Sequence, residues 1–319
     1  MSGTGCRSAS GQHIRSTMPA TPPDPATAAF EAHRPRLVRL AYRMLGSMLE
    51  AEDLVQEAWL RWQRADRAEV REPGAWLSRT VTRLCLDAMG SARARHETYL
   101  GPWLPEPIVE PADEAMRPDE LTLTLMLALE RLSPLERAAF LLHDVFDMPL
   151  DEVAAALDRR GPAVRQLAAR ARRHVRDARP RYTVAREEGE RIAQAFFAAS
   201  ASGDTAGLRS LLADNVVFHA DGGGKVLAFR WPIAGMDRVL RLFAGLARKY
   251  GARRVRFLRP VWIDGLPGYV SRERDEVLQT TALQIEDGRI SAIYVTRNPD
   301  KLAGIARTIG VGLPGCAVP

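Results

Sequence analysis

Arginine, glutamine and alanine side chains near the middle of the chain have types and spacing suited to reading DNA. Arginine donates two hydrogen bonds to guanine in the major groove, glutamine pairs with adenine, and alanine can contact the methyl group of thymine. Other arginines in the same stretch suit phosphate contacts, which position a protein without reading sequence. We assign base contacts to Arg165, Gln166, Ala169, Arg170 and Arg173, and phosphate contacts to Arg159, Arg160, Arg172 and Arg176.

Most of these side chains belong to a predicted helix over residues 162–176. Its apolar residues recur at helical spacing, which leaves the polar side chains on the remaining surface. A short predicted helix over 151–157 and a turn containing Gly161 precede it. This order is typical of a helix-turn-helix, in which the second helix enters the major groove. The alternative is a solvated amphipathic helix whose arginines serve only solubility. The apolar stripe consists of Val164, Leu167, Ala168, Ala171 and Val175.

A second basic segment lies at residues 75–95 and combines arginines with one tryptophan. Arg79, Arg83, Arg93 and Arg95 follow Trp76 within a predicted helix. Stacking aromatic rings and basic side chains together suit single-stranded DNA. Taken alone the signal is weak, because Trp76 can equally be a core residue.

An acidic helix is predicted between residues 49 and 59. Glu52, Asp53 and Glu57 lie on one side, next to an apolar stripe that includes Val55 and Ala58. Such a face is either ordinary helix surface or a docking site for a partner of complementary charge.

The elements that must position these residues fall into two helical blocks joined by a linker. Residues 25–98 and 119–181 both show helical periodicity, and Ser133, Pro134 and Glu136 form a helix start signal in the second block. Residues 99–118 are acidic and rich in proline, which predicts an extended linker. Trp103 and Leu104 are its apolar residues, so we expect this part to dock on another surface.

The third part of the chain, residues 188–297, predicts a different fold. Two helices come first, and short β-branched or aromatic runs separated by turns follow, with Asp287 and Gly288 predicting a hairpin turn. This order predicts an α+β domain with an antiparallel sheet. Residues 298–319 form a glycine-rich tail with one short predicted helix. Residues 1–24 read as a disordered leader and not as a signal peptide.

Composition favours an anionic partner and excludes several classes of protein. The 319 residues carry a formal net charge of +6, and no apolar run reaches the length of a membrane span. Three cysteines lie far apart, which argues against a disulfide framework and a zinc site. We therefore expect a soluble, cytoplasmic protein without a metal, a cofactor or a membrane contact.

Two features resemble catalytic or phosphate-binding sites without matching them. The string Gly222, Gly223, Gly224, Lys225 lacks the serine or threonine that follows the lysine in a phosphate loop, so we predict a turn. His219, Asp221, Arg230 and Asp264 could line an apolar pocket as acid and base. A domain attached to DNA-binding parts is more often a sensor or a docking module, so we assign no catalytic residues.

The two helical blocks resemble the two domains of extracytoplasmic-function sigma factors, which direct bacterial RNA polymerase to promoters. The string from Ala51 to Glu57 matches the helix that binds the β′ clamp helices of core polymerase, which implies a docking role for Glu52, Asp53, Gln56 and Glu57. Residues 75–95 match the segment that reads the minus-ten element, with Asp87 where a flipped base is read. Residues 151–176 match the reader of the minus-35 element. Promoter DNA and core polymerase, including its β subunit, are the implied partners.

Three further strings resemble the SigJ-like subgroup of that family. Its members carry a C-terminal SnoaL-like domain with the cone-shaped nuclear-transport-factor-2-like fold, which tunes activity from within the chain. The resemblance implies interdomain control by these strings, and we expect Trp103 to insert against the third domain. The strings contain Trp103, Leu104 and Glu106; Asp221, Gly222, Gly223, Gly224 and Lys225; and Asn298, Pro299, Asp300, Lys301 and Leu302.

Two other functions remain open at this stage. The chain could be a one-component regulator whose third domain senses a ligand, or an enzyme of the cyclase or isomerase type with a DNA-binding leader. The acidic helix around Asp53 favours the sigma factor, because a repressor needs no polymerase-docking domain. A small-molecule ligand in the cone is compatible with each reading.

Overall fold

The computed structural model describes residues 24–66, 69–97, 99, 101–109, 122–176, 184–251, 255–273 and 275–311. Residues 1–23 of the predicted leader and residues 312–319 of the tail lie outside these ranges, as do residues 110–121 and 177–183. Within them, no helix is long and apolar enough to cross a bilayer.

The first helical unit consists of three helices, α1 (Pro25–Leu45), α2 (Met48–Arg64) and α3 (Pro73–Glu97). Helix α1 begins with a proline and ends at Gly46, whose φ of 71° is left-handed and therefore suits glycine. Ser47 caps α2 by accepting a hydrogen bond from the Glu50 backbone N–H. The two helices are thus joined by a corner of two residues, Gly46 and Ser47.

The second helical unit contains the predicted helix-turn-helix. Its elements are α4 (Leu123–Leu129), α5 (Pro134–Phe140), the π-helical turn η2 (Leu141–Val145), α6 (Leu150–Leu157) and α7 (Gly161–Arg176). The predicted capping box is present, since Ser133 and Glu136 exchange hydrogen bonds with each other's backbone N–H. Asp158, with a φ of 51°, ends α6 and starts the turn into α7.

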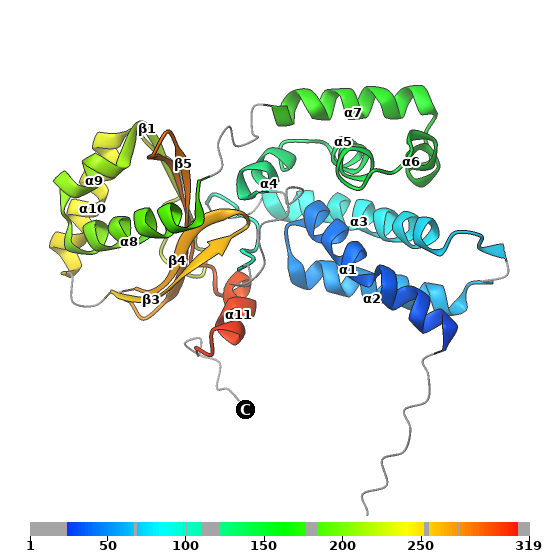
Figure 1. The fold of residues 1–319 in the computed structure, drawn as a ribbon, viewed down its shortest axis with the longest axis horizontal. Helices are drawn as coiled ribbons and strands as arrows, with labels where there is room; N and C mark the ends of the chain where they lie inside the picture. The colour runs from blue at the N-terminus through cyan, green and yellow to red at the C-terminus, as the bar shows by residue number, and fades with distance from the viewer. Residues whose placement is uncertain are drawn as a thin grey trace, which may run out of the picture.

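The two helical units share one hydrophobic core. Buried residues from α1, α2 and α3 form a continuous cluster with buried residues from α4 to α7. Arg137 of α5 is 4% exposed, and its Nη1 donates to the Met44 carbonyl at the end of α1 (2.7 Å). Arg36 donates to the Phe146 carbonyl (2.5 Å). In Figure 1, α5 and α6 lie between α3 and α7, so the two predicted DNA readers are one helix layer apart.

The C-terminal domain is a curved sheet with helices on both faces. Helices α8 (Arg186–Ser202) and α9 (Thr205–Leu211) come first, α10 (Met236–Tyr250) follows β2, and α11 (Pro299–Thr308) ends the described chain (Figure 1). The sheet order is β2-β1-β6-β5-β4-β3. Its strands are β1 (Leu212–Asp221), β2 (Ile233–Ala234), β3 (Arg256–Ile263), β4 (Leu266–Arg272), β5 (Leu278–Glu286) and β6 (Arg289–Thr296).

Two sequence predictions for this domain need correction. The sheet is mixed and not antiparallel, because β1 pairs in parallel with β6 after the chain has passed through α10 and four other strands. Helix α10 was not predicted, although Met236, Val239 and Leu240 have helical spacing and glycines flank the run. The predicted Asp287–Gly288 hairpin turn is present, with φ values of 50° and 73°.

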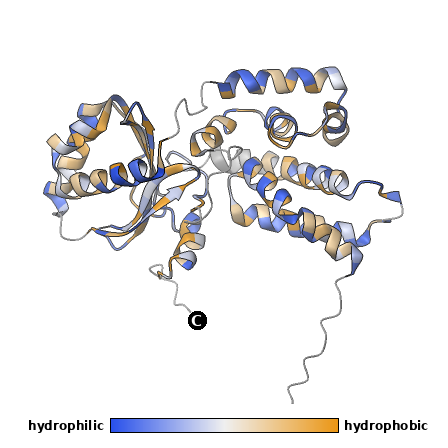
Figure 2. Cartoon of the chain, in the orientation of Figure 1, coloured by the Kyte–Doolittle hydropathy of each residue, from blue (hydrophilic) through white to orange (hydrophobic). Residues whose placement is uncertain are grey.

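The two faces of the sheet carry separate cores. One face packs against α8, α9 and α10. The other face packs against α11 and, unexpectedly, against residues from the other half of the chain, namely Leu104 of the linker and Leu123 of α4. The mostly hydrophobic α4 thus lies beside the C-terminal domain, whereas α7 is largely hydrophilic (Figure 2). The sheet therefore serves the linker as a docking surface.

Candidate functional site

Helix α7 presents its predicted DNA-reading side chains to solvent. Val164, Ala168, Ala171 and Val175 are buried, as the predicted apolar stripe requires. Arg172 differs from the other basic residues, because its Nε lies 2.6 Å from Asp144 Oδ1 and is already paired within the chain. The exposed residues are Arg159, Arg160, Arg165, Gln166, Ala169, Arg170, Arg172, Arg173 and Arg176.

Helix α3 places only part of the predicted minus-ten site on its surface. Arg83 and Asp87 are exposed one turn apart. Trp76 is half-buried, with its ring 5.4 Å from that of Trp62, so it also belongs to the core. Arg79 is half-buried, and its Nε has no hydrogen-bond partner among the described residues. Arg93 and Arg95 lie on the last turns of α3, where the side chains are outside the described part.

Helix α2 has the two-sided character that a docking helix needs. Glu52, Asp53 and Gln56 are exposed, and the half-buried Glu57 pairs with Arg61 at 2.9 Å. Ala51, Val55, Ala58 and Trp62 are buried on the opposite side. The acidic face is therefore accessible while the apolar stripe holds the helix in the fold.

The linker is fastened to the C-terminal domain through the carboxylate of Asp221, which ends β1 and is 1% exposed. Oδ1 accepts from Tyr99 Oη (2.5 Å) and the Gly223 N–H (2.9 Å). Oδ2 accepts from the Leu104 N–H (3.0 Å) and Lys301 Nζ (2.7 Å). Four donors from three segments saturate this carboxylate. Burial and the bond to Asp221 raise the pKa of Tyr99.

Lys301, on α11, holds the same stretch of linker from the other side. Its ammonium also donates to the Leu104 carbonyl and lies 4.3 Å from the ring centre of Trp103. Burial lowers the pKa of Lys301, against the opposing attraction of Asp221. The Trp103 ring packs on Gly46, where an added Cβ would overlap it. The indole is therefore held between the α1–α2 corner and α11.

Glu106 fixes the next part of the linker to the first helical unit. Its Oε2 accepts from the Met48 N–H (2.8 Å) at the N-terminus of α2, where a negative charge is favourable. Its backbone N–H donates to the Gly46 carbonyl (2.8 Å). The linker is thus bound on both sides, whereas the sequence predicted docking on the third domain only.

Asp264 forms a further anchor and is not the pocket residue that the sequence predicted. Tyr42 Oη donates to Oδ1 (3.1 Å), the Ile108 N–H donates to Oδ2 (3.2 Å), and the Leu123 N–H donates to its carbonyl (2.8 Å). Its φ of 46° belongs to a two-residue turn with Gly265 between β3 and β4. The Asp–Gly pair between two β runs is the signal that could have identified this turn.

The predicted group His219, Asp221, Arg230 and Asp264 does not line a common pocket. His219 stacks on Tyr294 with ring centres 5.2 Å apart, and burial lowers its pKa. Arg230 is exposed on a loop, and both aspartates hold the linker. The glycine string is a turn after β1, as predicted, with positive φ at Gly223 and Gly224.

The other subgroup strings surround the same anchor. Lys225 pairs with Asp300 at 2.6 Å on the surface. Asn298 caps α11 and donates from Nδ2 to Tyr99 Oη (3.0 Å), Pro299 opens that helix, and Leu302 is buried against the sheet. Residues from Gly222 to Lys225 and from Asn298 to Leu302 therefore lie around the linker strand that contains Trp103.

Replacement of Asp221 by Asn tests this anchor with almost no change in volume. The amide N–H groups of Asn would face groups that are themselves hydrogen-bond donors. The Lys301 ammonium would lose the carboxylate that neutralises its charge. We expect the change to cost about 3–5 kcal/mol of stability, measured by denaturant unfolding together with protease cleavage of the linker. Asp300→Asn removes an exposed ion pair in the same strings and should cost less than about 1 kcal/mol. Equal losses for the two variants would contradict the anchor.

Comparisons with known proteins agree with this organisation. The Sigma-70 region 2 family matches residues 29–95, and the Sigma-70 region 4 family matches residues 122–175. The ECF RNA polymerase sigma factor SigJ of Mycobacterium tuberculosis (strain ATCC 25618 / H37Rv) is 38% identical over 291 residues, which are 86% of this chain and 92% of that protein. The probable ECF sigma factor SigI of the same strain is 34% identical over 299 residues, 91% of this chain and 99% of SigI.

The crystal structure of M. tuberculosis SigJ is similar over 87% of this chain and 98% of that chain, with 35% identity and a TM-score of 0.69. The similarity thus extends through both helical units into the C-terminal domain. The predicted arrangement of two all-α sigma domains, the second a helix-turn-helix, followed by a C-terminal α+β domain is confirmed. The chain belongs to the extracytoplasmic-function (ECF) family of RNA polymerase sigma factors.

Proposed function

We propose that this sigma factor is held in a packed resting arrangement by its SnoaL-like domain and directs promoter-specific initiation after the linker is released. In this proposal the acidic face of α2 binds the β′ clamp helices, α3 reads the minus-ten element, and α7 reads the minus-35 element next to the β subunit. The observation that carries the proposal is the saturated Asp221 carboxylate, which joins the linker to the C-terminal domain.

Distances explain why the packed arrangement is a resting one. The two promoter elements are centred about 25 base pairs apart, which is about 85 Å at 3.4 Å per step. Helix α5 packs between α3 and α7 (Figure 1). Two helix-packing distances of about 8–10 Å each put those readers roughly 20 Å apart. Both reading faces are exposed, but they cannot reach both elements until the helical units separate.

We propose that the SnoaL-like domain regulates and does not catalyse. The His and Asp residues first considered as acid and base are used for stacking and for holding the linker. They therefore cannot act together on a substrate while the linker is docked.

Reversing the charge of the α2 face should weaken binding to core polymerase. Asp53→Lys with Glu57→Lys places like charge where the proposed partner surface is positive, and we expect a loss of about tenfold or more in affinity. The stability should change little, since the removed Glu57–Arg61 pair is exposed. Glu187→Lys, an exposed residue of α8, is the matched control. Unchanged binding of the double variant in a titration with labelled core enzyme would refute the docking face.

Single alanine substitutions on α7 should separate base contacts from phosphate contacts. Arg165→Ala and Arg170→Ala should each cost about 1–3 kcal/mol on the preferred promoter and relax the preference at particular positions. Arg173 is also assigned a base contact, so Arg173→Ala should have the same effect as these two variants. Arg172→Ala should have a smaller, sequence-independent effect, because Asp144 already pairs with its guanidinium. Binding to a panel of minus-35 variants measures both quantities, and identical profiles for all of these variants would contradict the assignment.

Removing the Trp103 side chain should release the linker and activate the protein. Trp103→Ala deletes the contacts with Gly46 and Lys301, so we expect about fivefold or more transcription in vitro, consistent with a typical coupling energy, and faster protease cleavage of the linker. Trp231→Ala, at a residue that is 75% exposed, is the matched control. Unchanged transcription and unchanged cleavage would end the proposal, and reduced transcription by a folded variant would exclude a resting state.

A further inference from the structure

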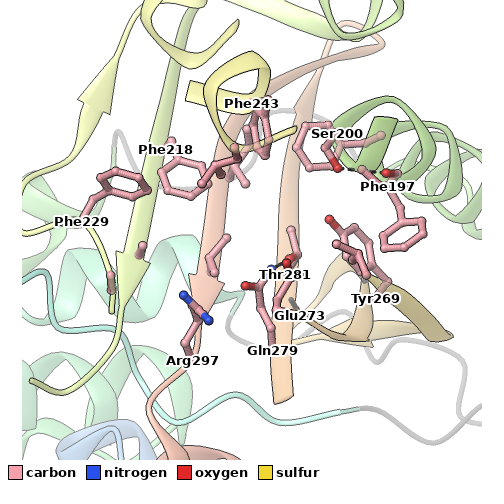
Figure 3. Close-up of a pocket in the computed structure, with 18 of the residues that line it drawn as sticks. Phe197, Ser200, Phe218, Phe229, Phe243, Tyr269, Glu273, Gln279, Thr281 and Arg297 are labelled. Atoms are coloured by element: carbon pink, nitrogen blue, oxygen red, sulfur yellow. Dashed lines mark hydrogen bonds between the residues drawn. The ribbon is translucent and has the colours of Figure 1, made fainter. Parts of the chain in front are cut away.

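A cavity of about 360 Å³ lies between the concave face of the sheet and helices α8 and α10. This size is within the range of small-molecule sites. Figure 3 shows rings from several elements turned towards its interior, and aromatic rings of this kind bury flat apolar molecules well. The rings labelled there are those of Phe197, Phe218, Phe229, Phe243 and Tyr269.

The cavity has one polar end, formed around Arg297. Its Nη2 lies 2.6 Å from Asp275 Oδ2, and its Nη1 donates to the Leu227 carbonyl (2.5 Å). Its Nε is buried and has no hydrogen-bond partner among the described residues. Arg297 lines the cavity, and its guanidinium carries five N–H donors, so it can donate to an oxygen acceptor of a ligand. Asp275 and the nearby Glu273 make an anionic group less suitable than a carbonyl or hydroxyl oxygen.

Two connections join this cavity to the docked linker. Arg297 and Asn298 directly follow β6. Arg297 lines the cavity, whereas Asn298 donates a hydrogen bond to Tyr99 of the linker. The backbone N–H groups of both residues donate to the Asp221 carbonyl, at 2.8 and 3.1 Å. The loop after β1 is the second connection, because Phe229 lines the cavity while its backbone lies against Gly101 of the linker.

The mouth of the cavity exposes apolar side chains that an occupant could cover. Leu227 is 74% exposed and Phe229 is 38% exposed, and both line the cavity. Closing this loop over an apolar molecule would bury their side chains, which is favourable in proportion to the area removed from water. The same loop also lies next to Gly101 of the linker. Occupation of the cavity and docking of the linker therefore act on one loop.

We propose that the cavity binds a flat, uncharged, mostly apolar molecule with a carbonyl or hydroxyl oxygen at Arg297, and that binding favours release of the linker. The regulatory consequence rests on the function proposed above, whereas the binding site does not. Because coupling between two sites is reciprocal, release of the linker must strengthen ligand binding by the same factor.

The test uses prodan, a neutral naphthalene ketone whose emission shifts to the blue in apolar sites, titrated with the full-length chain. We expect saturable blue-shifted binding. Ala201→Trp, which fills the cavity from α8, should abolish it, and Gln279→Trp is a second filling variant in case the first fails to fold. Ala198→Trp, at an exposed position of the same helix, should bind as the wild type does. Trp103→Ala should bind prodan about fivefold more tightly or better.

Absence of saturable binding to the wild type, or binding that survives both filling variants, would overturn the site. An unchanged prodan affinity in Trp103→Ala would overturn the coupling. That result is distinct from failure of the resting arrangement, which is read from transcription by Trp103→Ala without any ligand.

Discussion

The organisation of this sigma factor depends on one buried carboxylate. Asp221 ends a strand of the C-terminal domain, and only one of its four hydrogen-bond donors, the Gly223 N–H, belongs to the adjoining turn. The linker supplies Tyr99 and Leu104, and α11 supplies Lys301. A carboxylate removed from water is stable only when its acceptors are satisfied. The edge of the C-terminal domain is therefore incomplete without the linker, which makes the linker a structural element and not a spacer.

The sheet of the C-terminal domain connects the Asp221 anchor to the apolar cavity because its two faces have different contacts. One face and its helices enclose an apolar cavity, and the other receives Leu104 and Leu123 from the sigma half of the chain. Directly after β6, Arg297 lines the cavity and the next residue, Asn298, contacts the linker. A change on the cavity side is thus one residue away from the groups that hold Tyr99 and Asp221. Coupling between the cavity and the docked linker therefore does not depend on a long chain of contacts through the fold.

Local sequence patterns predicted individual helices and turns. They did not predict contacts between residues that are far apart in the sequence. The helix-turn-helix followed from the stripe around Val164 and the turn at Asp158, both of which are local. The parallel β1–β6 pair joins segments separated by most of the domain, so no local pattern reports it. Asp264 was read as a cavity residue because its partner Tyr42 lies 222 positions away. Helix α10, in contrast, was missed although its spacing was visible around Val239.

The central claim is that the free protein holds its two helical units together and that promoter binding separates them. Pulsed electron–electron double resonance measures the distance between spin labels on Arg39→Cys and His174→Cys, which are exposed positions on different helical units. Cys6 and Cys316 are replaced by Ser so that they carry no label, and Cys85 is buried. The account predicts one narrow, short distance in the free protein, replaced by a much longer one in the complex with core polymerase and promoter DNA. A broad distribution in the free protein, or the same short distance in a transcribing complex, would contradict it.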